Sequence, residues 1–193
     1  FTVAGTDRSI DIKAVAKAAF NKAQLPPDIE PGLYEHGEFG MGQGQAPTYP
    51  NGCHLAEVEI DVDTGKVDLV RYSAVDDAGT ILNPLLFDGQ VHGGIVQGAG
   101  QIMMEEVYYD ESGQLITGSF MDYGMPRADD FCSFDISARN PLGVKGVGEA
   151  GTVGAMPAMM NAINDALHHA GAPAIEMPAT PLKVWKALQQ AKG

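Results

Sequence analysis

The sequence predicts an α+β fold, because strand and helix patterns occur in clusters and do not alternate strictly as βαβ units. Charged and apolar residues alternate over 57–62, just ahead of the turn residues Asp63-Thr64-Gly65-Lys66, and this pattern indicates a β-hairpin. Two longer segments, 84–103 and 156–170, carry apolar residues at helical spacing. We expect residues 1–193 to be a single domain or a fragment of one, since this length suffices for one hydrophobic core.

The N-terminal part of the chain predicts one helix and a long loop. Apolar residues recur at helical spacing over 11–22, and Ser9 or Asp11 can cap the start of this helix. Residues 24–52 are rich in Pro and Gly, and a loop of that length tends to be functional or to cover a partner. Within it, Gly40–Gln45 looks like a phosphate loop but lacks a Lys at Walker spacing, so we expect a flexible cover.

The hairpin is expected to form part of the core. Its first strand is expected to have one solvent-exposed face and one buried face. The returning strand, 67–75, is more apolar and is expected to be covered on both faces. The remaining elements, in chain order, are a helix from Pro84, a hairpin over 108–118, a strand over 134–137, a helix over 156–170 and a short helix from Pro181 to near Ala191.

The composition argues against nucleic-acid and membrane partners. A formal net charge of -13 repels phosphate backbones and anionic lipids, and no apolar run approaches the ~18 residues that span a bilayer. Cys53 and Cys132 lie far apart without CxxC spacing, so we expect two reduced, buried thiols. The histidines show no ligand spacing, so we predict no histidine metal site and expect His54 to be a satisfied structural residue.

The strongest local signal is the segment 145–154, in which glycines surround Glu149 just ahead of a predicted helix. Gly146-x-Gly148-x-x-Gly151 fits the GxGxxG of dinucleotide-binding folds, but no good strand precedes it and no acidic residue ends a second strand ~20 positions later. A glycine-rich turn with a solvated or capping Glu149 is a structural alternative. The third interpretation is a catalytic carboxylate, because the following helix directs its N–H groups and positive dipole end at the loop.

Glycines also interrupt the predicted helix over 88–101. Each Gly costs roughly 1 kcal/mol against Ala, so another backbone or a flat ligand is expected to pack against this helix. Gln90 and Gln97 carry amides that donate and accept hydrogen bonds at once, which suits the edge of a pterin. The alternative is tight helix packing with both amides facing solvent.

Four segments, in the same order, resemble the large, molybdenum-binding subunit of the xanthine dehydrogenase, carbon monoxide dehydrogenase and aldehyde oxidase family. They are TYPNGCHLAEVEID at 48–61, VDDAGTILNP at 75–84, GQVHGGIVQG at 89–98 and GVGE at 146–149. The likeness is closest to the carbon monoxide dehydrogenase-like branch and covers nearly the whole chain. It implies a mixed, largely antiparallel sheet with packed helices, as in the molybdopterin-binding domain of molybdenum hydroxylases.

The resemblance implies oxidative hydroxylation of a carbon centre, or oxidation of carbon monoxide, with water as the oxygen source. By its position Glu149 matches the family's catalytic base, which accepts a proton as the oxygen attacks the substrate. The implied cofactor is molybdenum–molybdopterin, in bacteria usually the cytosine dinucleotide form, and no residue of this chain is expected to ligate the metal. The groups expected to place the pterin or dinucleotide are Gln90, Lys145, Gly146, Val147 and Gly148.

The resemblance also implies partners. FAD and [2Fe–2S] clusters are expected on flavin and iron–sulfur subunits, since this chain has no Cys pattern for a cluster. The family's loop that faces the metal from the other side is absent, and the chain opens with Phe1-Thr2-Val3-Ala4 rather than Met. We therefore expect a fragment that needs the remainder of the molybdenum subunit and is inactive alone.

Such a fragment should expose a large apolar face where the missing half docks. We further expect a small-molecule substrate, an oligomer and a cytoplasmic location. Relatives act on carbon monoxide, aldehydes, purines and N-heterocycles, and the resemblance does not choose among these. The alternatives are a non-catalytic cofactor-binding or assembly module and a nucleotide-dependent dehydrogenase.

Overall fold

The computed structural model describes residues 1–37, 48–138 and 143–191. The chain divides into two compact units, Phe1–Pro47 and Thr48–Gly193. The predicted cover over Gly40–Gln45 lies outside the described residues. The expectation that residues 1–193 form one domain or a fragment of one stays a prediction.

In the first unit, helix α1 (Ile12–Ala19) begins where the carboxylate of Asp11 accepts hydrogen bonds from the backbone N–H groups of Lys13 and Ala14. The helix is shorter than the predicted span of 11–22. The side chain of Asn21 accepts from the N–H of Ala23 and caps a 3-10 turn at Lys22–Gln24. This local bond competes with continuation of the α-helix.

The second unit contains a sheet whose described strands lie in the order β1 (Gly52–Ile60), β2 (Val67–Asp76) and β3 (Phe134–Ala138). β1 and β2 form the predicted antiparallel hairpin, and β3 joins β2 in parallel. The α+β class with a mixed sheet is therefore confirmed. The parallel pairing brings the end of β3 to the same edge of the sheet as the end of β2.

The expectation that β2 is covered on both faces is wrong within this chain. Val67, Leu69 and Tyr72 are buried in the core, but Val70 and Val75 are 45% and 49% exposed. The apolar side chains of β2 therefore leave one face of the sheet open to solvent, and such surfaces commonly meet a partner.

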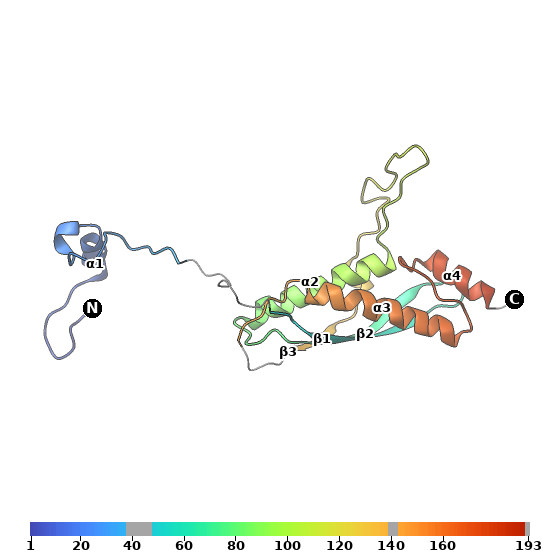
Figure 1. Ribbon diagram of the computed structural model, residues 1–193, viewed down its shortest axis with the longest axis horizontal. Coiled ribbons are helices and arrows are strands. Elements are labelled where there is room, and N and C mark those ends of the chain that lie inside the picture. The colour runs from blue at the N-terminus through green and yellow to red at the C-terminus, as the bar shows by residue number, and fades with distance from the viewer. Residues whose placement is uncertain (38–47, 139–142, 192–193) are drawn as a thin grey trace. The chain divides into compact units, whose positions relative to one another are not determined.

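Helices α2 (Pro84–Met103) and α3 (Ala150–His169) lie side by side over the sheet, with α4 (Pro181–Gln190) near the C-terminal end of the unit (Figure 1). Their glycines allow the backbones to meet. A Cβ added to Gly94 would lie 3.0 Å from the Cα of Gly151, and one added to Gly98 would lie 2.7 Å from the carbonyl oxygen of Thr152. These two glycines of α2 thus serve tight helix packing.

Helix α3 begins at Ala150 and not at the predicted Met156. The glycines of this stretch favour a loop in the sequence, yet they are packing positions. A Cβ added to Gly151 would lie 2.5 Å from the carbonyl oxygen of Val91, and one added to Gly154 would lie 2.5 Å from the ring of His54. Tertiary contacts here outweigh the low helix propensity of Gly.

The core of the second unit lies between the helices and one face of the sheet. Its fully buried side chains include Tyr72, Val91, Ile95, Met159, Ile163, Leu167 and Val184. The predicted hairpin over 108–118 is reduced to a bridge between Tyr109 and Leu115, in a segment that leaves the body of the unit (Figure 1). Among the described helices, none combines the length and apolar character needed to cross a membrane.

Candidate active site

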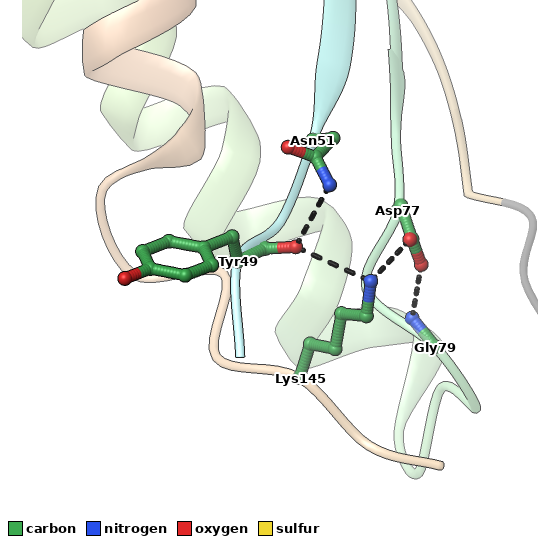
Figure 2. Close-up of polar contacts among 5 residues, drawn as sticks. All are labelled: Tyr49, Asn51, Asp77, Gly79 and Lys145. Atoms are coloured by element: carbon green, nitrogen blue, oxygen red, sulfur yellow. Dashed lines mark hydrogen bonds and ion pairs between the residues drawn. The ribbon is translucent and has the colours of Figure 1, made fainter. Parts of the chain in front are cut away.

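Lys145 opens the glycine-rich segment and anchors it to the residues that follow β2. Its ammonium group forms an ion pair with the carboxylate of Asp77 and donates to the carbonyl oxygen of Tyr49 at 3.2 Å (Figure 2). The backbone N–H of Lys145 donates to the carbonyl of Ala78 at 3.0 Å. Asp77 also accepts from the N–H of Gly79 at 3.1 Å. The Lys145 ammonium group thus has partners within the chain and holds the segment in place, while the cofactor contact expected from the Lys145 backbone N–H stays a prediction.

Gln90, from α2, holds the other end of the same segment. Its Nε2 donates to the carbonyl oxygen of Gly148 at 3.0 Å. Gln97, the second amide considered for a pterin edge, accepts from the hydroxyl of Thr152 at 3.3 Å. Gln90 and Gly148, two of the predicted site residues, are therefore in direct contact, whereas Gln97 is engaged between α2 and α3.

Gly146 and Gly148 differ from the glycines of the helix interface. A Cβ added to either would meet no atom of the described residues within 4 Å. Packing among the described residues therefore does not require Gly at these positions. Open space beside a backbone without a side chain lets a ligand approach closely, so the segment could accommodate the edge of a pterin or a dinucleotide.

Four of the predicted cofactor residues line one hollow. Gln90, Lys145, Val147 and Gly148 border a space of about 340 Å³ between the glycine-rich segment and the start of α2. Its opposite wall is apolar and includes Leu82 and Leu86, whose side chains are 80% and 68% exposed. Gly146 is not among the residues that border this hollow.

Glu149 lies at the N-cap of α3, but among the described residues its side chain accepts no capping hydrogen bond. Of the structural alternative, a solvated or capping Glu149, the cap is therefore wrong, whereas the exposure of Glu149 agrees with the solvated form. The residue is exposed and lines a second hollow of about 340 Å³, bordered also by Tyr49, His54 and Asp76. The predicted base and four of the predicted cofactor residues thus line two different hollows, although Gly148 and Glu149 are adjacent in the chain.

Beneath the second hollow lies a buried hydrogen-bonded chain. Nδ1 of His54 is 2.6 Å from the hydroxyl of Tyr72, and Nε2 is 3.2 Å from a carboxylate oxygen of Asp76. Burial, with a smaller contribution from the Asp76 charge, raises the pKa of Tyr72 well above its usual range. The hydrogen bonds of His54 are thus satisfied, as predicted.

Tyr72 and Asp76 are not among the site residues predicted from the sequence. In the hairpin register His54 pairs with Ala74, and residues two positions either side of Ala74 share its face of the sheet. The sequence therefore contains the information that places Tyr72 and Asp76 beside His54, but using it requires the residue-by-residue pairing of β1 with β2.

In the part of the chain that the structure describes, the cysteines and the other potential metal ligands form no cluster. Cys53 is exposed and Cys132 is half-buried, so the expectation of two buried thiols is wrong for Cys53. Burial raises the pKa of the Cys132 thiol. Among residues 1–37, 48–138 and 143–191, no three His, Cys, Asp or Glu side chains gather closely enough to hold a metal ion.

The chain is similar to molybdenum-dependent proteins in sequence. The profile of the molybdopterin cofactor-binding domain matches residues 1–132. The chain is 37% identical, over 185 residues, to the carbon monoxide dehydrogenase large chain of Afipia carboxidovorans, and covers 22% of that protein. It is 38% identical, over 193 residues, to the nicotine 6-hydroxylase large subunit of Paenarthrobacter nicotinovorans, and covers 23% of it. These alignments include 93% and 96% of this chain.

The structure agrees with this similarity. It superposes on the crystal structure of a Cu,Mo-containing carbon monoxide dehydrogenase with a TM-score of 0.73 at 36% identity, over 93% of this chain and 23% of that chain. Quinoline 2-oxidoreductase from Pseudomonas putida 86 gives a TM-score of 0.72 at 34% identity, over 92% of this chain and 23% of its own. The chain therefore spans about a quarter of the length of these relatives.

Proposed function

The chain belongs to the molybdopterin cofactor-binding domain family of the molybdenum hydroxylases, and from this premise we propose that it contributes a catalytic base and part of the cofactor site to such an enzyme. The base is Glu149. The reaction is hydroxylation of a carbon centre, or oxidation of carbon monoxide, with oxygen taken from water. One observation carries the proposal. The Glu149 carboxylate makes no capping hydrogen bond to helix α3, and Glu149 lines a hollow next to the glycine residues 146 and 148.

The residues around the first hollow would hold the cofactor. Gly146, Val147 and Gly148 offer backbone N–H groups to its polar edge, and Gln90 and Lys145 fix the two ends of this segment. The cytosine dinucleotide form is our proposal for the bound species. When bound, molybdenum–molybdopterin supplies the two-electron redox chemistry and the activation of water-derived oxygen.

The part that Glu149 plays is the movement of one proton. A carboxylate oxygen of Glu149 accepts the proton from the water-derived oxygen as that oxygen attacks the substrate carbon. General bases of this kind contribute roughly 100- to 10,000-fold to a rate. The hollow that Glu149 shares with Tyr49, His54 and Asp76 would admit a small-molecule substrate, or a part of a larger one.

The exposed apolar surface beside the first hollow is evidence for a partner that covers it. Leu82, Leu85 and Leu86 are 80%, 79% and 68% exposed at the start of α2, and water-exposed apolar clusters usually mark an interface. Because the chain spans about a quarter of its relatives, we propose that the remainder of the molybdenum subunit covers this surface. Subunits bearing FAD and [2Fe–2S] clusters would complete the enzyme, and the chain alone would be inactive.

A non-catalytic cofactor-binding or assembly module is the second candidate. It is favoured by the separation of the two hollows, since the residues around the first could bind a cofactor without Glu149 taking part. The two candidate functions predict different turnover when the Glu149 carboxylate is removed: the catalytic role predicts its loss, and the binding module predicts no change.

The deciding experiment compares Glu149→Gln with Glu176→Gln, the same substitution at another exposed position, in the intact enzyme. Turnover would be measured on carbon monoxide, an aldehyde, a purine and an N-heterocycle, together with molybdenum content. We expect Glu149→Gln to retain molybdenum and to lose turnover, while Glu176→Gln keeps both. Near-native turnover in Glu149→Gln would rule out the base and leave the binding module.

A further inference from the structure

The buried chain of Tyr72, His54 and Asp76 joins the sheet to the site. His54 lies on β1, and Tyr72 and Asp76 lie on β2, on either side of the residue with which His54 pairs. The side chains of His54 and Asp76 are 4% and 3% exposed, and Tyr72 is fully buried. Polar groups buried this deeply are costly unless they are hydrogen-bonded, and these three satisfy one another.

The imidazole of His54 is also a spacer between the sheet and α3. A Cβ added to Gly154 would lie 2.5 Å from three atoms of the His54 ring, so the ring contacts the backbone of α3 directly. Gly154 belongs to the second turn of the helix that starts immediately after Glu149. The position of the ring therefore sets how closely the first turns of α3 approach the sheet.

The other end of the buried chain supports the opposite wall of the second hollow. A Cβ added to Gly52 would lie 2.1 Å from Oδ1 of Asp76, so the carboxylate is packed against the start of β1. The neighbouring backbone is tied down as well, because the N–H of Asp77 donates to the carbonyl of Asn51 at 2.7 Å. Asn51, Gly52, His54 and Asp76 all border the hollow that Glu149 lines.

We propose that Tyr72, His54 and Asp76 form a positioning unit for Glu149. Side chains of β2 hold both nitrogens of the imidazole, and the ring contacts the second turn of α3 at Gly154, so the unit fixes the backbone from which the Glu149 side chain extends. The three residues do not touch the reacting atoms. The inference rests on the proposed role of Glu149, because a unit that places a base matters for the rate only if that base works.

The physical reason is the sensitivity of proton transfer to geometry. A displacement of about 1 Å at a reacting group can cost on the order of 100-fold in rate. A flexible side chain in place of the ring would let the start of α3 move by such an amount without unfolding the domain. Turnover at each cofactor-loaded centre would then fall, although the fold and the cofactor content persist.

The test uses His54→Gln and Tyr72→Phe in the intact enzyme. Gln can keep a bond to Asp76 but lacks the rigid ring, and Phe removes only the hydroxyl and leaves the imidazole–carboxylate pair in place. His168→Gln, the same substitution at an exposed position in the last turn of α3, is the matched control. The measurements are kcat per bound molybdenum, KM, and hydrogen exchange of the backbone amides of residues 150–156.

We expect His54→Gln to lower kcat per molybdenum by about 10- to 100-fold, to change KM less than kcat, and to speed exchange at the start of α3. Tyr72→Phe should show the same effects to a smaller degree, and it decides the matter if His54→Gln does not fold. His168→Gln should match the wild type in all three measurements.

A purely structural role would lower stability and molybdenum content while kcat per molybdenum stayed native, and this result would overturn the inference. If Glu149→Gln is inactive while His54→Gln and Tyr72→Phe keep native kcat per molybdenum, only the inference of a positioning unit fails. If Glu149→Gln turns over normally, the proposed function and this inference fail together.

Discussion

The side-chain amide of Gln90 donates to the carbonyl oxygen of Gly148 at 3.0 Å, although the two residues are 58 positions apart in the sequence. This bond fixes the peptide that precedes Glu149 to helix α2. Together with the Lys145–Asp77 ion pair, it holds both ends of an open stretch of backbone. A cofactor would therefore meet a segment that is already ordered, which lowers the entropic cost of binding.

Replacing Gln90 by Leu is expected to weaken cofactor binding by about tenfold, the equivalent of losing one hydrogen bond of roughly 1.4 kcal/mol from the bound state, and so to lower the molybdenum content of enzyme made under limiting molybdenum. Gln101→Leu, at an exposed position on the same helix, should retain the metal. Elemental analysis of the purified enzymes measures the difference. Equal molybdenum in the two variants would show that the Gln90–Gly148 bond does not prepare the site.

Replacing Lys145 by Met should reduce the free energy of unfolding of the chain by about 1–3 kcal/mol, because Asp77 would keep its charge in a largely buried place without its cation. The two side chains are only 18% and 19% exposed. Lys66→Met is the control, since the pair between Lys66 and Asp68 is 65% and 53% exposed and such pairs contribute little. Urea titrations that gave the same midpoint for both variants would contradict this account of the brace.

The helix interface predicts opposite effects for two glycines of α2. Gly98→Ala should destabilise the chain by about 1–3 kcal/mol through overpacking, since its Cβ would lie 2.7 Å from the carbonyl of Thr152. Gly93→Ala meets no described atom within 4 Å and should stabilise the helix by about 0.4–1 kcal/mol. Thermal unfolding of the two variants tests the packing, and a shift of the same sign in both would show that the interface is wrong.

The two cysteines should react at different rates with iodoacetamide. Thiolates are the reacting form, and a raised pKa reduces the thiolate fraction at any given pH. The raised pKa of Cys132, together with its partial burial, therefore predicts slow labelling at pH 7.5 that accelerates as the pH rises, whereas exposed Cys53 is labelled first. Peptide mass spectrometry follows each site, and faster labelling of Cys132 at pH 7.5 would refute the prediction.

Local chemistry explains which parts of the fold could be predicted. The turn after Ile60, the cap at Asp11 and the start of α2 after Asn83 depend on residues close in sequence, and all three formed as predicted. The start of α3 could not be predicted from residues close in sequence. Gly151 and Gly154 disfavour a helix locally, and only the contacts with Val91 and His54 explain them.

The same distinction between local and tertiary contacts explains which residues of the candidate site could be predicted. The glycine pattern around Glu149 predicts a site in this segment, and there is open space beside Gly146 and Gly148. The contact of Lys145 with Asp77 was not foreseen, because a Lys beside a glycine-rich loop suggests a ligand as readily as an ion pair. Tyr72 and Asp76 were missed because they join the site only through the strand register.

The most direct test of the central claim is anaerobic rapid mixing of the intact enzyme with its best substrate, following reduction of the cofactor in a single turnover. For Glu149→Gln we predict a reduction rate about 100- to 10,000-fold below that of the wild type, at unchanged substrate affinity and full molybdenum content. A reduction rate equal to that of the wild type would contradict the assignment of Glu149 as the base.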